Sequence, residues 1–290
     1  EAAREGTLAH KLAELKLRNY FFTPEFGKRK LNAAVKKLKE EGAWADEMMG
    51  YTDDYLDYVK SLALAFPAMP SVRLEQKVFY DAWVPEGFGT ADCILMSGGV
   101  LHIIDFKYGK GVPVSAEGNP QLSLYALGAC AAYQMLYPID TVRLSIVQPR
   151  LADGITEWEC SLKELLAWGD WVKERAALAY EGKGEFAPGE KTCRFCRAKA
   201  QCRARSDKNV ELAFPAGGIP PLITAKEAGE RLTALEDVVR YQKDLQEWAL
   251  SECLAGREVP GWKAVEGRSG REWSDMEKAF AALQENGITE

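Results

Sequence analysis

Apolar residues recur at helical spacing in several long segments of the chain. In residues 5–20, Leu8, Leu12 and Leu15 lie three or four positions apart, and Thr7 is suited to cap the first turn. Asn119 and Pro120 have the residue types of an N-cap and a first helical position for the apolar run that follows them. The pattern therefore predicts helices over residues 5–20, 46–65, 121–136, 162–180 and 223–256.

Between the second and third of these helices, the apolar period changes to two residues, which is typical of strands. Residues 72–80 alternate, and the apolar runs 91–96 and 100–105 follow, joined to each other by a Ser-Gly-Gly turn. These runs predict three consecutive antiparallel strands. Residues 141–150 predict a further strand that stops at Pro149. The order of helices, three strands, helix and strand predicts an α/β (α+β) core with a mixed sheet flanked by helices.

Composition narrows the class of protein. The chain has 47% hydrophobic residues, no apolar run long enough to cross a bilayer, and no signal peptide at its start. We therefore expect a cytoplasmic protein without a membrane partner. A net charge of −6 argues against a protein that coats nucleic acid by bulk attraction. Two local basic runs remain, at 28–39 and 193–208, and the first is expected to be a solvated helix face.

A Pro- and Gly-rich stretch at 214–221 predicts a boundary between two regions. We expect a first domain over residues 1–210, a linker over 211–222, and a helical C-terminal extension over 223–290. The chain starts at Glu1 and ends inside a helix-like pattern. We therefore expect both ends to be cut from a longer protein.

Two aspartates and a lysine stand out within the predicted strands. Residues two apart in a strand face the same side, so Asp105 and Lys107 should point together, and Asp92 lies on the partner strand across the turn. Two carboxylates held close are unfavourable without a cation between them, and oxygen ligands favour Mg²⁺ or Mn²⁺. A lysine beside such a metal suits phosphodiester hydrolysis. The alternative is a surface hairpin with a salt bridge.

Three more residues could join this group. Gln121 and Tyr125 are four apart on a predicted helix and share one face, where they could contact a nucleic acid. A capping glutamine and a half-buried tyrosine are the alternative. His10 ends the segment "EGTLAH" on the first predicted helix. A lone helical histidine is usually structural, although a metal site can accept one imidazole.

Together these residues resemble a nuclease family. "GTADCIL", "IIDFKYG" and "QLSLYA" resemble motifs II, III and IV of the PD-(D/E)XK superfamily in its RecB-like branch, and "EGTLAH" resembles the first motif of that branch. More closely, the combination is similar to the prophage-encoded family catalogued as domain of unknown function 2800. The resemblance covers roughly residues 5–205 and implies a restriction-endonuclease-like core.

The resemblance also implies roles for individual residues. His10, Asp92, Asp105 and the backbone carbonyl of Phe106 would bind the metal, and Lys107 would be the catalytic lysine. Gln121 and Tyr125 would shape the catalytic site and touch DNA. Glu75, on the strand before Asp92, is a weaker match to an acidic residue that the branch often has.

Three of the seven cysteines have ligand spacing, namely Cys193, Cys196 and Cys202. Zinc and a [4Fe-4S] cluster both want four ligands, and only three are local. The resemblance implies an iron–sulfur cluster whose fourth cysteine precedes the first motif, in a segment that this chain does not include. A zinc site completed by another residue, or three reduced thiols, are the alternatives. The basic residues around the cysteines could guide DNA, and the candidates are Arg194, Arg197, Arg203 and Arg205.

These observations predict a Mg²⁺- or Mn²⁺-dependent deoxyribonuclease, and more specifically an exonuclease in phage DNA replication, recombination or repair. The expected partners are DNA and phage single-strand-binding or recombination proteins. A second hypothesis is a DNA-binding or scaffolding module that keeps the nuclease fold without turnover. A third is a protein-interaction domain stapled by zinc.

Overall fold

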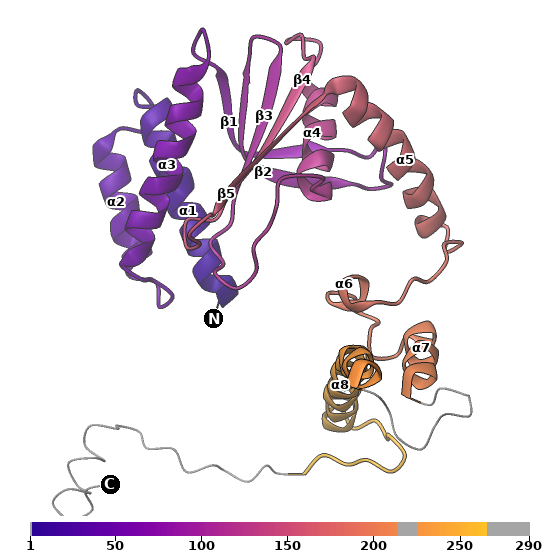
Figure 1. Ribbon diagram of the computed structural model, residues 1–290. Coiled ribbons are helices and arrows are strands. Elements are labelled where there is room, and N and C mark those ends of the chain that lie inside the picture. The colour runs from indigo at the N-terminus through magenta and orange to yellow at the C-terminus, as the bar shows by residue number, and fades with distance from the viewer. Residues whose placement is uncertain (1, 214–224, 266–290) are drawn as a thin grey trace, which may run out of the picture. The chain divides into compact units, whose positions relative to one another are not determined.

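The computed structural model describes residues 2–213 and 225–265, which form parts of two compact units, Glu1–Gly184 and Glu185–Glu290 (Figure 1). The first unit contains all five strands that are described. Its elements in chain order are α1 (Ala2–Phe21), α2 (Lys28–Lys39), α3 (Glu47–Ala65), β1 (Ser71–Phe79), β2 (Phe88–Ser97), β3 (Val100–Phe106), α4 (Pro120–Tyr133), β4 (Thr141–Val147), β5 (Ile155–Ser161) and α5 (Leu162–Tyr180).

The five strands form one mixed sheet in the order β1-β2-β3-β4-β5. The first three strands are antiparallel, as the sequence predicts, and β4 runs parallel to β3 after the α4 crossover. Gly98 and Gly99 both have positive φ, so they supply the tight turn between β2 and β3. The predicted α/β class, with a mixed sheet flanked by helices, is confirmed.

The edge strand β5 was not predicted from the sequence. It pairs antiparallel with β4, but most of its side chains are exposed or half-buried. Within β5, only two apolar residues are buried or half-buried, Trp158 and Cys160, and their neighbours are charged or polar. The apolar alternation is therefore too weak to predict a strand. The basic run at 28–39 forms α2, whose lysines are exposed as expected for a solvated helix face.

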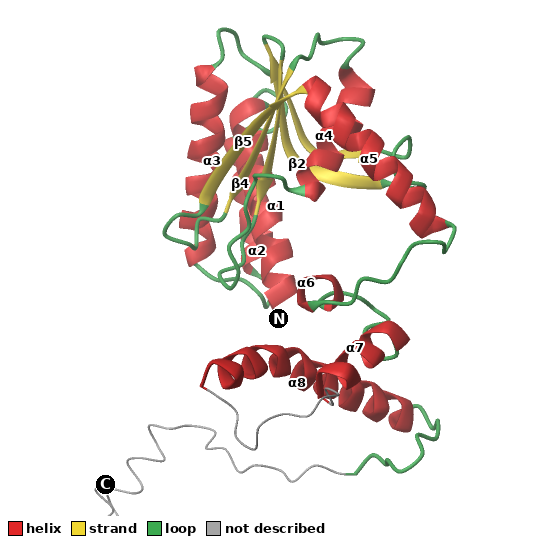
Figure 2. Cartoon of the chain, turned by 45° about the vertical axis from the view of Figure 1, so that its right-hand side comes forward, coloured by secondary structure: helices red, strands yellow, loops and turns green. Residues whose placement is uncertain are grey.

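Helices cover both faces of the sheet (Figure 2). The helices α1, α2 and α3 lie on one side, and α4 and α5 on the other. On β3, Ile104 and Phe106 pack with the first group, whereas Leu101 and Ile103 pack with the second, as the alternation of a strand requires. Each face thus has its own apolar core, and the polar residues of the site lie where the two strands β2 and β3 separate.

The second unit consists of helices among the residues described. They are α6 (Glu190–Cys193), α7 (Arg203–Ala213) and α8 (Ala225–Leu254), and α7 packs against α8. The predicted helix over 223–256 is confirmed as α8. The predicted linker begins inside α7, because that helix continues to Ala213, and the rest of the linker and most of the predicted tail lie outside the described residues. No helix in the described ranges has the length and apolar character needed to cross a membrane.

Candidate functional site

The sheet forks between β2 and β3, and two aspartates flank the fork. The two strands pair as far as Cys93 and Ile104, after which β2 stays with β1 and β3 stays with β4. Asp92 and Asp105 are the next residues beyond that last pair, one on each strand. The backbone N–H of Phe106 donates to Asp92 Oδ2 at 2.7 Å. Beyond the fork, the carboxylate thus takes the place of the β2 backbone as the acceptor for this N–H group. The sequence prediction that the hairpin brings these aspartates together is confirmed.

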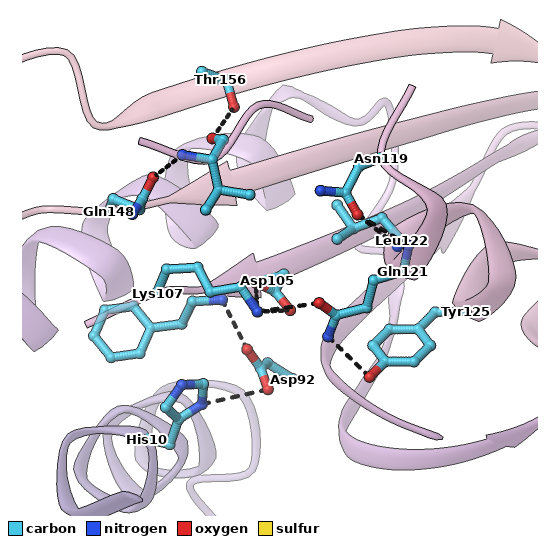
Figure 3. A network of polar contacts seen from close by, with 12 residues as sticks. His10, Asp92, Asp105, Lys107, Asn119, Gln121, Leu122, Tyr125, Gln148 and Thr156 are labelled. Carbon is cyan, nitrogen blue, oxygen red and sulfur yellow. Dashed lines mark hydrogen bonds and ion pairs between the residues drawn. The ribbon is translucent and has the colours of Figure 1, made fainter. Parts of the chain in front are cut away.

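His10 reaches the fork from α1. Its Nδ1 lies 3.4 Å from Asp92 Oδ1, and its ring meets the Phe106 ring edge to face at 5.2 Å (Figure 3). The helix that carries His10 is anchored in the core by Leu8, Leu12 and Leu17, all of them buried. The histidine is therefore held by a buried helix face while its imidazole stays half-buried at the site.

Glu75 completes the group through an unusual backbone conformation. It has a φ of 47°, in the left-handed region that non-glycine residues enter at a cost of about 1–3 kcal/mol. Leu74 and Val78 would share a face in a regular strand, yet they pack in different cores on opposite sides of the sheet. The kink at Glu75 therefore turns the strand over and brings its carboxylate beside Asp92.

The three side chains form the one cluster of potential metal ligands found among the described residues. One ligand atom from each of His10, Glu75 and Asp92 lies within 4.8 Å of the others, and each residue is half-buried. Two carboxylates and an imidazole suit a hard divalent cation such as Mg²⁺ or Mn²⁺. Sequence analysis offered Glu75 only as a weaker match, because a strand pattern gives no sign of a residue in the left-handed conformation.

A chain of hydrogen bonds fixes Lys107 beside Asp105. Lys107 Nζ lies 2.9 Å from Asp105 Oδ2 and 3.1 Å from Oδ1, and it also approaches Gln121 Oε1 at 3.4 Å. Gln121 Nε2 in turn donates to Tyr125 Oη at 3.0 Å. The prediction that these four residues gather at one place is confirmed (Figure 3). The salt bridge of the alternative interpretation is present, but the Asp105 side chain is only 5% exposed, so the pair is not a surface salt bridge.

Helix α4 is positioned by its first turn. The side chain of Asn119 accepts from the backbone N–H groups of Gln121 and Leu122, and Pro120 occupies the first helical position, as predicted. Asn119 Nδ2 also donates to the Ser115 carbonyl at 3.0 Å. The cap therefore ties the loop after β3 to the helix that presents Gln121 and Tyr125.

The carboxylates at the fork are held in unfavourable surroundings. Burial, followed by repulsion from Asp92, raises the pKa of Asp105 to about 6, although Lys107 opposes the shift. Burial and the charges of Asp92 and Glu14 raise the pKa of Glu75 to about 7. Burial works against protonation of His10, but the hydrogen bond and charge of Asp92 outweigh it and raise that pKa. A bound cation would relieve this repulsion.

The three cysteines expected to bind a cluster lie in the second unit, and each has different surroundings. Cys193 is buried and accepts from the backbone N–H of Gly189 at 3.4 Å, Cys196 is exposed, and Cys202 is half-buried. In the part of the chain that is described, these sulfur atoms do not form a compact group of three ligands. The arrangement does not fit a metal centre as it stands, so the iron–sulfur cluster and the zinc alternative stay predictions.

The arginines near the cysteines divide into two kinds. Arg194, Arg197 and Arg203 are exposed. Arg205 is 3% exposed and lies between two helices, with its guanidinium 2.6 Å from Asp244 and 3.6 Å from Asp237. Its charge is thus occupied inside the unit, and the predicted contact with DNA is better tested at the three exposed arginines.

The fold and the fork define a mixed α/β protein with a candidate divalent-cation site between two strands. The whole chain, residues 1–290, matches the family described as "Protein of unknown function (DUF2800)", and the protein belongs to that family. A solved structure titled "Crystal structure of SSO0001" is 17% identical to this chain, with 67% of this chain and 85% of that chain covered. Its TM-score of 0.29 is too low to support any conclusion about fold or function.

Proposed function

We propose that the protein is a Mg²⁺- or Mn²⁺-dependent deoxyribonuclease of the PD-(D/E)XK type, RecB-like branch, and that it acts as an exonuclease on phage or prophage DNA. One observation carries the proposal. The fork holds carboxylates with raised pKa values, a histidine and a lysine in one group. Such clusters are concentrated at functional sites, because folding alone gives no reason to gather them.

The residues present fit a divalent cation. His10, Glu75 and Asp92 would hold it, and Asp105 and the carbonyl of Phe106 would complete the set that the family resemblance implies. When bound, the cation would polarise a phosphoryl oxygen and lower the pKa of a water molecule. The placement of Glu75 by a strained backbone supports the same reading, since strain of this kind is often retained at functional sites.

Lys107 would orient the attacking water and stabilise the charge that develops on the phosphate. Its ammonium is held by Asp105 and Gln121, so it lies at a defined position with its side chain 29% exposed to solvent. Gln121 and Tyr125, linked to each other, would position the substrate backbone. A preorganised cation of this kind stabilises a transition state without rearrangement during the reaction.

The first experiment tests cleavage directly. Single- and double-stranded DNA, labelled at either end, is incubated with the protein in Mn²⁺, Mg²⁺ or EDTA, and the products are sized. We expect degradation that EDTA abolishes and that Lys107→Ala removes. Lys60→Ala is the matched control, because Lys60 also pairs with an aspartate, at 2.8 Å, on a helix away from the fork. Full activity of Lys107→Ala would contradict the proposal.

Calorimetry of Mn²⁺ binding tests the cation site without relying on activity. We expect binding by the unmodified protein and its loss in Asp92→Asn. If the protein binds DNA but neither binds Mn²⁺ nor cleaves, the alternative of a silent DNA-binding module is favoured. Visible absorption of an anaerobic preparation would show separately whether the cysteines carry an iron–sulfur cluster.

A further inference from the structure

Two exposed phenylalanines face each other on the hairpin arm, which we define as residues 76–91 of β1, β2 and their connection. Phe79 and Phe88 are directly paired across the strands, with ring centroids 6.4 Å apart. They are 56% and 57% exposed, unlike the buried Phe106 of the neighbouring strand. The Nζ of Lys77 lies over both rings, 4.9 Å from one centroid and 4.3 Å from the other. The arm thus presents two aromatic rings and a cation to solvent.

The arm is held rigidly. Tyr80 donates its hydroxyl to the Phe88 carbonyl at 2.7 Å and its backbone N–H to the Gly87 carbonyl at 3.0 Å. On the α4 side, the ring of Tyr125 packs so closely on Gly89 that a Cβ there would lie 2.3 Å from the ring. The two phenylalanines are therefore presented on a fixed surface rather than on a loose turn.

The aromatic pair lies close to the fork along the same two strands. Val78 packs in the core beneath α4, so its neighbours Lys77 and Phe79 project from the opposite face, the one on which α1 lies. Phe79 is four residues beyond Glu75, and Phe88 is four residues before Asp92. At the rise of a strand, this separation is about 13 Å. Both figures show the arm extending beyond the rest of the sheet (Figure 1, Figure 2).

We propose that Phe79, Phe88 and Lys77 form a stacking platform for the unpaired bases of a single-stranded nucleic acid. This inference rests on the proposed nuclease function and gives that site a substrate class, namely a strand whose bases are unpaired next to the fork. Bases stack on exposed aromatic rings whatever their sequence. On binding, the Lys77 ammonium would move from the ring faces, where it now lies, to the phosphate of the stacked nucleotide.

The combination of rings and charge selects this ligand over other partners. An apolar protein surface docked on the two rings would bury the Lys77 ammonium without a counter-charge, which is strongly unfavourable. A nucleotide offers a flat ring and an anion within one unit, so both parts of the platform find a partner. A base-paired duplex hides its ring faces inside the stack and would offer only its phosphates and its end.

The test measures binding in a protein that cannot cleave. In an Asp105→Asn background with EDTA, fluorescence anisotropy compares a single-stranded oligothymidine with an abasic oligomer of equal length and charge. We expect the oligothymidine to bind about 10-fold more tightly. Phe79→Leu with Phe88→Leu should remove this difference while retaining apolar character, and Phe79→Tyr with Phe88→Tyr should restore it.

Trp171→Ala supplies the matched control, because Trp171 is also exposed and also lies beside a cation, with Arg175 at 3.9 Å from its ring, but on α5. That variant should keep the preference for bases. Leucine variants that keep the preference would overturn the platform. An equal loss of affinity for a blunt duplex would also overturn it, since the contact would then be with phosphates alone.

The platform and the nuclease proposal can fail separately. If the leucine variants lose the preference for bases while the unmodified protein cleaves no DNA, the platform stands and the proposed function is wrong. If the unmodified protein cleaves DNA while the leucine variants bind both oligomers as before, the nuclease stands and the platform is wrong.

Discussion

Two groups of charged residues in this chain are partly or fully buried, and they differ in how well their charges are balanced. At the fork, Glu75, Asp92 and Asp105 share one histidine and one lysine, so negative charges outnumber their partners. In the second unit, the buried guanidinium of Arg205 faces Asp244 and Asp237. There, Lys199 also reaches Asp244 at 2.8 Å, and each buried charge has a counter-charge.

The difference shows in the pKa values of the carboxylates. Repulsion and burial raise the pKa of Asp105 and Glu75, whereas hydrogen bonds from Arg205 and Lys199 overcome burial and lower the pKa of Asp244. A lowered carboxylate pKa stabilises the folded protein at neutral pH, and a raised one destabilises it. The second group is therefore built for stability, and the fork is built at the expense of stability, which is expected of a binding or catalytic site.

Neutralising Asp105 should have the largest effect, because we expect it to lower cleavage activity and to raise stability. We expect Asp105→Asn to lower DNA cleavage at least about 100-fold, because it removes a proposed metal ligand and the partner of Lys107. The same change relieves repulsion from Asp92, so the midpoint of thermal unfolding without divalent cations should rise by about 2–4 °C. Gel-based cleavage assays and calorimetry measure the two effects.

Asp53→Asn is the control for this trade-off. Asp53 pairs with Lys16, whose side chain is only 6% exposed, so its carboxylate has a favourable partner. The control should lower the unfolding midpoint and leave cleavage unchanged. If Asp105→Asn also lowers the midpoint, the fork does not hold its carboxylates at the expense of stability.

Removing a charge from the second group should have the opposite effect on stability. Asp244→Asn removes the nearer counter-charge of the buried Arg205 and leaves Asp237, at 3.6 Å, so it should destabilise the contact between α7 and α8 by about 3 kcal/mol. Hydrogen exchange followed by mass spectrometry can measure this loss of protection in the two helices while β3 serves as an internal reference.

Glu236→Gln tests whether burial is the cause of that effect. Glu236 pairs with Arg240 on the same helix α8, at 3.3 Å, but both side chains are well exposed. Its loss should change protection by less than about 0.5 kcal/mol. Equal effects of the two substitutions would show that burial of Arg205 does not matter.

The sequence predicted the first unit well because its elements follow simple periods. Strand alternation placed Asp105 and Lys107 on one side, and helix spacing placed Gln121 and Tyr125 on one face. The edge strand β5 escaped prediction because an exposed strand carries little apolar alternation. Helix α7 also escaped, since its pattern of charged residues and alanines gives a weak helical signal.

The site was predicted only in part, for reasons of backbone geometry. Glu75 reaches Asp92 through a positive φ, and no residue pattern predicts that conformation for a glutamate. Arg205 was grouped with its exposed neighbours because charge alone does not reveal burial. Its counter-charges lie on α8, more than thirty residues away in sequence, and only the packed helices bring them together.

A buried histidine outside the fork, His102, also makes the stability of the protein depend on pH. His102 lies 2.7 Å from Ser145 Oγ, and burial, followed by the charge of Arg143, lowers its pKa to about 3. An unfolded histidine binds a proton near pH 6.5, so the folded state loses stability as the pH falls below that value. Between pH 7 and pH 5, His102 alone should lower the free energy of unfolding by about 2 kcal/mol.

Urea unfolding followed by circular dichroism at the two pH values measures this contribution. His102→Gln should reduce the loss of stability on acidification by that amount. Ser145→Ala removes the hydrogen-bond partner but leaves a buried imidazole, so it should keep the dependence on pH. A His102→Gln protein whose stability changes with pH as before would contradict this account, because the raised pKa values of the fork carboxylates shift stability in the opposite direction on acidification.

The smallest expected effect concerns Asn119, the N-cap of the helix α4 that carries Gln121 and Tyr125. Asn119→Ala removes the acceptor for the first backbone N–H groups of α4 and should destabilise the first unit by about 1 kcal/mol. Ser161→Ala removes the capping box of α5 and should destabilise it by a similar amount. The two caps thus match in stability but differ in what their helices carry, because only α4 presents Gln121 and Tyr125 to Lys107. Asn119→Ala should therefore lower cleavage several-fold more than Ser161→Ala, and equal cleavage by the two variants would show that the start of α4 does not position these residues.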